Sequence, residues 1–239
     1  MLSLKNIGVF LGSQRILDGL DLKVAEGEFA VIIGANGTGK STLFNVISGT
    51  LLPAYGETII GGIANNFEQV TRVFQDPRVG TVGNFTIFEN MALALNRRKG
   101  YRFIPFANRK RRELFRERLA ILGMNLENRL EDRACSLSGG QRQALSLVMS
   151  TLGEYEVLLL DEITAALDPR SSEMVMALAN KIVSAERKTC LMATHNMRHA
   201  LDFGGPLLVL RNGKFEQSFT RGQKQKLSPS ELIETFVCS

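Results

Sequence analysis

Alternating apolar and polar residues open the chain, and this period of two predicts two half-exposed strands over Leu2–Leu11 and Leu17–Val24. After a turn at Glu26-Gly27-Glu28, the run Phe29–Ile33 is apolar without alternation. An unbroken apolar run of this kind is typical of a parallel strand that is covered on both faces. The chain therefore begins with exposed strands and then enters the core of a sheet.

Helical and strand patterns alternate through the rest of the chain, with one long exception. No strand pattern occurs from about Thr86 to Met149, where apolar residues fall at helical spacing under charged ones, so we expect a helical insert there. The dipeptide Asn212-Gly213 between two β-like runs predicts a hairpin. The other predicted elements are helices over 40–48 and 171–184 and strands near 58–60, 70–74, 157–160, 189–193 and 207–210.

These elements predict an α/β fold in which a parallel sheet core carries a small antiparallel β subdomain and an inserted helical subdomain. A chain of 239 residues has room for one such domain. We expect residues 1–85 and 150–239 to form its core and residues 86–149 to form the insert. No apolar run approaches the roughly 18 residues that a membrane span needs, and the opening residues lack the apolar stretch of a signal peptide.

A glycine-rich loop lies between the buried strand and the first helix. It fits the pattern G-x-x-x-x-G-K-[ST], in which glycines let backbone N–H groups wrap a triphosphate while the helix N-terminus adds positive charge. We expect Lys40 to reach the β- and γ-phosphates, Ser41 to place its hydroxyl on Mg²⁺ and Thr42 to meet the α-phosphate side. The predicted ATP-binding residues are Gly34, Ala35, Asn36, Gly37, Thr38, Gly39, Lys40, Ser41 and Thr42.

Two carboxylates, Asp161 and Glu162, end the buried strand Val157–Leu160. An Asp at the mouth of such a strand can hold Mg²⁺, and a second carboxylate beside it can orient and deprotonate an attacking water. For this pair taken alone, an acidic strand end that merely enters solvent is the alternative.

The segment Leu137-Ser138-Gly139-Gly140-Gln141 has the pattern S-x-x-Q of a capping box at a helix start. Capping accounts for Ser138 and Gln141. It does not account for Gly139 and Gly140, because each glycine weakens a helix by about 0.5–1 kcal/mol relative to alanine. We therefore expect an anionic group to approach the backbone closely at these two glycines.

In these motifs and their order, the sequence resembles the nucleotide-binding subunit of ATP-binding-cassette (ABC) transporters, a type of P-loop NTPase, over nearly the whole chain. Gly34–Thr42 resembles the phosphate loop of this family, Leu137–Gln141 its signature motif and Val157–Asp161 its Walker B strand. The remaining matches are Gln75 in the Q-loop, Glu162 as the catalytic carboxylate, Asp168 in the D-loop and His195 as the switch histidine.

The resemblance implies a mechanism that needs two copies of the chain, because the phosphate loop of one and the signature motif of the other would sandwich each ATP. Glu162 would polarise the attacking water, His195 would hydrogen-bond the γ-phosphate, and Gln75 would sense Mg²⁺ and the membrane partner. The residues that contact ATP in trans would be Ser138, Gly139, Gly140, Gln141 and Asp168, and the metal would be held by Ser41, Gln75 and Asp161.

The same resemblance implies the cofactors, partners and location. ATP and Mg²⁺ would be the cofactors, and the partners would be a second copy, transmembrane permease subunits and, through the permease, an extracytoplasmic solute-binding protein. The chain itself would be cytoplasmic and peripheral on the inner face of the cell membrane. Three widely spaced cysteines fit a reduced compartment.

Two features depart from the common family pattern. An aromatic residue that stacks on adenine usually precedes the glycine of the first hairpin, whereas Leu11 precedes Gly12 here. Phe10, one position earlier, is then a candidate for adenine stacking or a core residue. After Glu162, the segment Ile163–Ala166 replaces the commoner Pro-Thr-Ser-Ala. The segments Thr164–Pro169 and Thr194–Leu201 resemble the branch of ATPases that serves uptake systems of the tryptophan/tyrosine type.

The positive charge of the chain is concentrated in one segment. The net charge is +5, but residues 96–118 hold ten basic and two acidic side chains and carry +8, which leaves −3 for the rest. This segment is either a solvated helical face or a surface near the permease and the anionic cytoplasmic leaflet. Nucleic acid is disfavoured as a partner because no platform of stacking aromatics accompanies the charges.

The two histidines, His195 and His199, are four residues apart, a spacing that can hold zinc on a helix. No third ligand is evident, so we expect His199 to be a surface residue rather than a metal ligand.

Taken together, the motifs predict an ATPase subunit that energises uptake of a small solute. The alternative is a soluble ABC ATPase that remodels a ribosome or a DNA-repair complex, although such relatives usually carry two cassettes or long coiled-coil inserts. A cassette that only senses nucleotide would lack an intact catalytic site. Neither the solute nor the direction of transport is determined by this chain.

Overall fold

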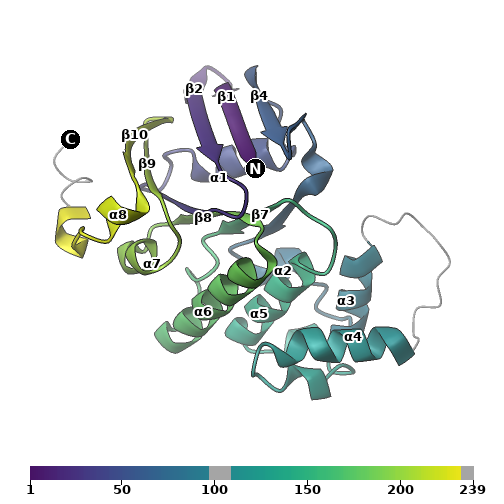
Figure 1. The fold of residues 1–239 in the computed structure, drawn as a ribbon. Helices are drawn as coiled ribbons and strands as arrows, with labels where there is room; N and C mark the ends of the chain where they lie inside the picture. Colours follow the sequence, from purple (N-terminus) through teal and green to yellow (C-terminus); the bar gives the residue numbers. More distant parts are fainter. Residues whose placement is uncertain (97–108, 233–239) are drawn as a thin grey trace. The chain divides into compact units, whose positions relative to one another are not determined.

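The computed structural model describes residues 1–96 and 109–232, and the chain divides into two compact units (Figure 1). The first unit comprises residues 1–72, 155–162 and 180–239, and the second comprises residues 73–154 and 163–179. No helix in the described parts of the chain combines the length and the apolar character that a membrane crossing requires.

A six-stranded sheet forms the centre of the first unit, with the strand order β10-β9-β3-β8-β7-β6. The central strands β3 (Phe29–Ile33), β8 (Thr189–Thr194) and β7 (Val157–Asp161) are parallel and buried along their whole length. Their unbroken apolar runs explain this position, because both faces of a parallel sheet are covered. The strands outside this centre are β6 (Val70–Val73), β9 (Leu207–Arg211) and β10 (Lys214–Phe219). The prediction of a parallel core is confirmed.

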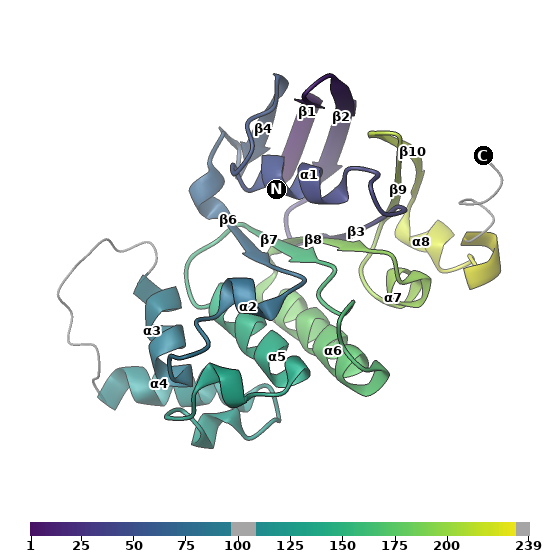
Figure 2. The ribbon, with the colours of Figure 1, turned by 180° about the vertical axis from the view of Figure 1, so that it is seen from behind.

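A separate four-stranded antiparallel sheet packs in the same unit, and the helix α1 (Lys40–Ile47) lies between the two sheets (Figures 1 and 2). Within β1, Leu2 and Leu4 are buried and alternate with exposed or half-buried neighbours. The burial changes phase before Ile7 and Val9, because the register with β2 shifts between Leu4 and Ile7. In sheet order, the strands are β2 (Gln14–Val24), β1 (Leu2–Leu11), β4 (Tyr55–Ile60) and β5 (Ile63–Ala64). The apolar side chains of both sheets and of α1 form one core cluster.

The edge strand β10 runs antiparallel to β9 and is joined to it by the predicted hairpin. Asn212 and Gly213 have φ values of 47° and 74°, the left-handed conformation that a two-residue turn of this type requires. The first unit also contains α7 (Met197–Asp202), α8 (Arg221–Lys224) and a 3₁₀ turn at Phe67–Gln69.

The expectation that His199 is a surface residue is wrong. Its exposed fraction is 2%, and the edge of its ring faces Phe203 with 6.0 Å between the ring centroids. The short helix α7 packs on β3 and β8, so the residue at its third position turns toward the sheet. An imidazole ring has enough apolar body to be buried beside an aromatic ring.

The second unit is helical, as predicted for the insert. Apart from Val73, the last residue of β6, and a single bridge between Thr86 and Arg133, its described residues contain no strand. Phe115 and Leu119 on α4 are fully buried, and the Phe115 ring packs against Phe88 at 5.3 Å. The helices are α2 (Pro77–Gly80), α3 (Ile87–Asn96), α4 (Arg109–Ala120), α5 (Gly139–Ser150) and α6 (Pro169–Glu186), with 3₁₀ turns at Leu126–Asn128 and Ala134–Ser136. Residues of α6 beyond 179 belong to the first unit.

Candidate functional site

The predicted phosphate loop connects β3 to α1 in the first unit. Gly39 stands at the N-cap of α1 with φ 103°, and no side chain caps the helix. The left-handed backbone at this position favours glycine, and the uncapped N–H groups of the first turn are free to bind an anion. The loop therefore has the backbone geometry that its sequence predicts.

Lys40 folds back over the loop that precedes it. Its Nζ donates hydrogen bonds to the carbonyl oxygens of Gly34 at 2.8 Å and Ala35 at 3.1 Å, and its side chain is only 5% exposed. Thr38 closes the loop from within, because its Oγ1 donates to the Ala35 carbonyl at 3.0 Å. The ammonium group is thus held at the centre of the loop by backbone oxygens.

Glu162 connects Lys40 to His195. Its Oε1 lies 3.3 Å from Lys40 Nζ and its Oε2 lies 3.1 Å from His195 Nδ1. The Glu162 N–H donates to the Ala193 carbonyl at 2.9 Å, which fixes the residue against β8. The three side chains meet because β3, β8 and β7 are neighbours and their carboxyl ends share one edge of the sheet.

Asp161, at the end of β7, is buried and paired with an arginine that the sequence analysis did not single out. Arg72 on β6 donates from Nη2 to Asp161 Oδ2 and from Nη1 to Asn45 Oδ1 at 2.7 Å. Its guanidinium also lies over the Phe44 ring, 5.7 Å from the centroid. The sequence signal was an arginine inside the short predicted strand at 70–74, because a charged residue that a sheet buries needs a partner of opposite charge.

The other motif residues lie in the second unit. Gln75 is exposed, and the carbonyl oxygen of Phe74 before it accepts a hydrogen bond from Gln143 Nε2 at 3.0 Å. The Q-loop segment runs from Phe74 to Thr81, and at its second end Arg142 Nε donates to Thr81 Oγ1 at 2.7 Å. Because Arg142 and Gln143 both belong to α5, the helix that begins at the signature motif holds the Q-loop at both ends.

Ser138 and Gln141 form the predicted capping box at the start of α5, with both reciprocal hydrogen bonds present. For Gly140, packing adds a second explanation to the predicted approach of an anionic group, which stays a prediction. A Cβ on Gly140 would lie 2.8 Å from Ser171 Cβ and Oγ, so packing requires glycine there without any ligand. A Cβ on Gly139 would meet only Leu167, at an ordinary 3.5 Å. Packing therefore explains the glycine at position 140 but not the glycine at position 139, for which a closely approaching ligand remains the explanation.

Asp168 lies just before α6 and accepts a hydrogen bond from the Ser171 N–H at 3.1 Å. The Ser171 hydrogen bonds, side chain first and backbone second, lower the pKa of Asp168 below its usual value. Its carboxylate therefore caps the helix, and its predicted contact with ATP in trans stays a prediction.

Phe10 is 40% exposed on the antiparallel sheet of the first unit. Its ring centroid lies 6.4 Å from that of Tyr55, and the Arg15 guanidinium stands 5.4 Å from the ring. Phe10 is thus not a core residue, and its stacking on adenine stays a prediction.

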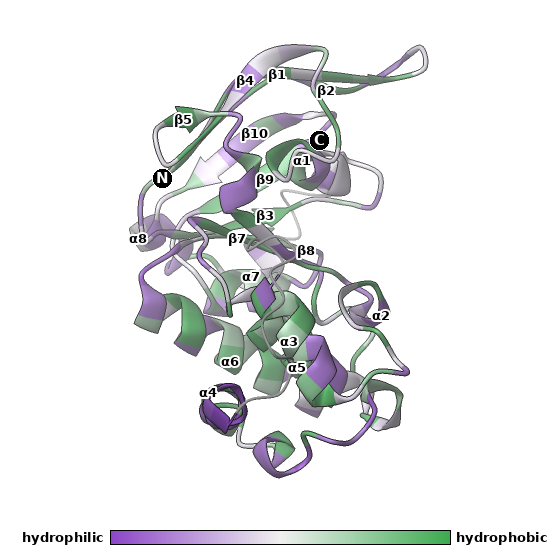
Figure 3. Cartoon of the chain, turned by 90° about the vertical axis from the view of Figure 1, so that its right-hand side faces the viewer, coloured by the Kyte–Doolittle hydropathy of each residue, from purple (hydrophilic) through white to green (hydrophobic). Residues whose placement is uncertain are grey.

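The basic segment is only partly a solvated face. Figure 3 shows α4 as strongly hydrophilic, and Arg109 on it pairs with Glu113 at 2.9 Å in the open. Arg111, however, is buried and donates from Nη2 to Asn96 Oδ1 at 3.3 Å, while Arg112 pairs with Glu131 and stands 4.8 Å from the Phe88 ring centroid. The other basic residues of the segment before α4 lie outside the described residues, namely Arg97, Arg98, Lys99 and Arg102.

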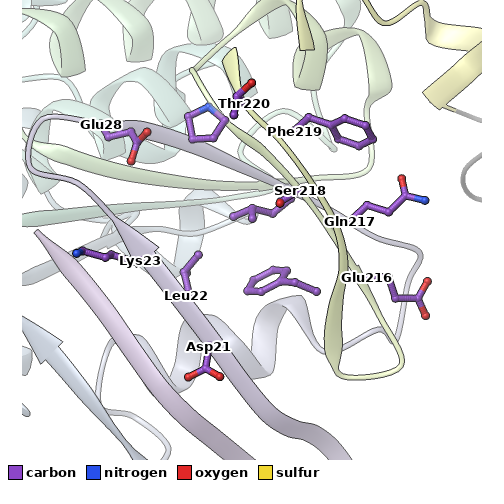
Figure 4. A pocket seen from close by; sticks show the side chains of 12 residues that line it. Asp21, Leu22, Lys23, Glu28, Glu216, Gln217, Ser218, Phe219 and Thr220 are labelled. Carbon is purple, nitrogen blue, oxygen red and sulfur yellow. The ribbon is translucent and has the colours of Figure 1, made fainter. Parts of the chain in front are cut away.

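A cavity of about 400 Å³ opens elsewhere on the first unit, between β2 and β10 (Figure 4). Asp21, Lys23, Glu28 and Glu216 bring charges of both signs to it. Among the described residues that line it, none belongs to the predicted ATP site.

Comparison with known proteins matches residues 17–165 to the family described as ABC transporter. Over 99% of this chain, the sequence is 40% identical to a tyrosine transport ATP-binding protein of Clostridioides difficile (strain R20291), of which 98% is covered. An aliphatic sulfonates import ATP-binding protein of Nocardia farcinica (strain IFM 10152) is 31% identical over 85% of this chain and 75% of its own length.

Solved structures show the same architecture. A dimeric ATP-binding cassette in a post-hydrolysis state, bound to ADP and Pi, superposes with a TM-score of 0.78 at 28% identity, covering 92% of this chain and 99% of that one. A nucleotide-free cassette from an ABC transporter gives a TM-score of 0.83 at 24% identity, over 100% of this chain and 97% of that one. The predicted α/β fold with an antiparallel sheet and a helical part is confirmed.

Proposed function

Because this chain belongs to the ABC transporter family and is an ATP-hydrolysing cassette, we propose that it energises the uptake of an aromatic amino acid through separate permease subunits. The choice of solute rests on the relative that is named for tyrosine transport and matches almost the whole chain at 40% identity. The observation that carries the energising role is the contact of Glu162 with both Lys40 and His195 at the end of the sheet.

In the proposed mechanism, the γ-phosphate of ATP takes over the position that Glu162 occupies beside Lys40. Lys40 and the uncapped N–H groups of α1 then bind the phosphates, and Glu162 is released to accept the proton of the attacking water. His195, held 3.1 Å from Glu162, is placed to donate a hydrogen bond to the γ-phosphate. The ion pair with Lys40 thus places the base beside the phosphate loop.

The oxygen ligands at this edge of the sheet fit Mg²⁺. The Ser41 hydroxyl follows the phosphate loop, and the Asp161 carboxylate ends β7. No cluster of three or more His, Cys, Asp or Glu side chains suited to a metal occurs in the described residues, and Mg²⁺ commonly takes only one or two protein carboxylates together with substrate phosphates. We propose Ser41, Asp161 and Gln75 as the residues that hold it, and when bound the ion would neutralise charge on the phosphates.

We further propose that the whole chain, with residues 1–85 and 150–239 as core and about 86–149 as insert, works as a homodimer. Gly139 supports this arrangement, since its missing side chain leaves backbone accessible that packing does not need. Permease subunits in the membrane and an extracytoplasmic solute-binding protein complete the proposed importer, with this chain on the cytoplasmic face. Remodelling of a ribosome or a DNA-repair complex finds no support among the relatives described above.

The replacement Glu162→Gln tests the base assignment. It removes the proton acceptor but keeps the shape of the side chain, so kcat for ATP hydrolysis should fall by about 100- to 10,000-fold while ATP still binds. Bound ATP should then trap a dimer, measured by size-exclusion chromatography with light scattering. Glu57→Gln, which removes an exposed carboxylate on β4, is the control and should hydrolyse ATP at the wild-type rate. Full hydrolysis by Glu162→Gln would refute the assignment.

A further inference from the structure

Arg72 occupies an unusual position for a charged residue. It lies on β6 inside the first unit, and its side chain is 11% exposed. Its guanidinium group contacts three residues on two elements, namely Asp161 on β7 and both Asn45 and the face of Phe44 on α1. The arginine is therefore anchored at several points and not merely placed beside an acid.

The Asp161 carboxylate is compensated by this arginine. Asp161 is buried, and an uncompensated buried carboxylate would be strongly destabilising. Arg72 donates to Oδ2 and thereby fixes the orientation of the group. The two carboxylates at the end of β7 are thus each held by one cation, Asp161 by Arg72 and Glu162 by Lys40.

Lys40 and Arg72 differ in how freely their side chains can move when nucleotide binds. Lys40 has a single flexible stem and can turn from Glu162 to the phosphates. Arg72 remains tied to Asn45 at 2.7 Å and stacked on Phe44, so its charge stays beside Asp161. A divalent cation that approaches Asp161 must share this carboxylate with a fixed positive charge.

We propose that Arg72 is a positioning residue that orients Asp161 before nucleotide binds and then competes with Mg²⁺ for it, so that the chain needs a higher Mg²⁺ concentration to bind nucleotide tightly. This inference rests on the proposed Mg²⁺ role of Asp161. It predicts that removing the charge at position 72 strengthens Mg²⁺-dependent binding, whereas the loss of a purely structural arginine would weaken binding with and without the ion.

The experiment is calorimetric titration of the full chain with AMP-PNP, a nucleotide that is not hydrolysed, across a series of Mg²⁺ concentrations and in EDTA. For Arg72→Met, the Mg²⁺ concentration that gives half of the affinity gain should fall by about tenfold relative to wild type, as expected for one charge removed within a few Å. Affinity in EDTA should stay close to that of wild type. Arg72→Gln, which removes the charge but keeps a polar side chain, carries the same expectation should Arg72→Met unfold.

Control variants separate this inference from the function on which it rests. Arg72→Lys keeps the charge and should show the wild-type Mg²⁺ requirement, and Lys5→Met removes one charge from the antiparallel sheet and should change nothing. Asp161→Asn should abolish the Mg²⁺ dependence. If the wild-type chain itself showed no Mg²⁺ dependence, the Mg²⁺ site would be refuted together with the role of Arg72. If Asp161→Asn lost the dependence but the Arg72→Met and wild-type curves coincided, the role of Arg72 alone would be overturned.

Discussion

Glu162 is the residue of the candidate site that contacts both Lys40 and His195. It adopts a left-handed backbone conformation with φ 46°, which costs about 1–3 kcal/mol for a residue other than glycine. The backbone hydrogen bond to Ala193 and the contacts with Lys40 and His195 hold it there. Such strain at the end of a buried strand directs the carboxylate toward the phosphate loop rather than into solvent.

The replacement Lys40→Ala should lower the affinity of the chain for ATP, because it removes one cation from the phosphate loop. The ammonium group is the only side-chain cation that the described loop residues 34–42 provide, and a hydrogen bond to a charged group is worth about 1.5–3 kcal/mol, or roughly 10- to 100-fold in affinity. Titration of the full chain with AMP-PNP measures the change. Lys5→Ala, on the exposed face of β1, serves as control, and unchanged affinity in Lys40→Ala would refute its role.

At the scale of elements, α5 organises the second unit. Its first turn carries the capping box, its next residues hold both ends of the Q-loop, and Ser146 one turn later leaves no room for a side chain at Gly80, where a Cβ would lie 2.6 Å from Ser146 Oγ. The signature motif and the Q-loop are therefore parts of one packed body. A displacement of either segment must move the other.

Gly139 and Gly140 should respond differently to the same replacement. Gly140→Ala forces a Cβ against Ser171 and should destabilise the chain by about 1–3 kcal/mol, as overpacking does. Gly139→Ala meets no clash and should be neutral or stabilise the helix by up to about 1 kcal/mol. Urea unfolding of the two variants measures the difference. Adding Ser171→Gly should selectively rescue Gly140→Ala, and equal stability of the two single variants would contradict the packing explanation.

At the scale of the whole molecule, the charge of the chain is divided between a mildly acidic body and one basic segment. The structure sorts the described basic residues of that segment by role. Arg111 and Arg112 are committed to contacts within the second unit, whereas Arg109, Lys110 and Arg116 are exposed. Among the basic residues of this segment that the structure describes, these three exposed side chains are available to a membrane or permease surface.

Neutralising the exposed residues tests this role. The triple variant Arg109→Gln, Lys110→Gln and Arg116→Gln should lower association with anionic liposomes by tenfold or more, since each basic residue near such a surface contributes about 1 kcal/mol. ATP hydrolysis by the isolated subunit should be unchanged. Lys5→Gln, Arg15→Gln and Lys23→Gln together remove the same charge from exposed positions of the antiparallel sheet and form the control. Equal association of both variants in cosedimentation would leave the solvated face as the remaining explanation.

The features that depend on neighbours along the chain could be predicted from the amino-acid pattern. The apolar runs of β3, β7 and β8 required burial on both faces, Asn212-Gly213 required a tight turn, and Ser138 with Gln141 specified a helix cap. The phosphate loop could be recognised from the sequence for the same reason, because its glycines and Lys40 are close neighbours along the chain. Each of these is a local rule of conformation or hydrogen bonding.

The contacts between residues far apart in sequence could not be predicted from the pattern and became visible in the folded chain. Arg72 and Asp161 are separated by 89 positions, and neither strand pattern states which partner the arginine takes. Gly140 is small because Ser171 lies against it, and His199 is buried because α7 packs on the sheet. Burial and steric exclusion arise from whichever surface the fold brings near, so the pattern along one segment cannot express them.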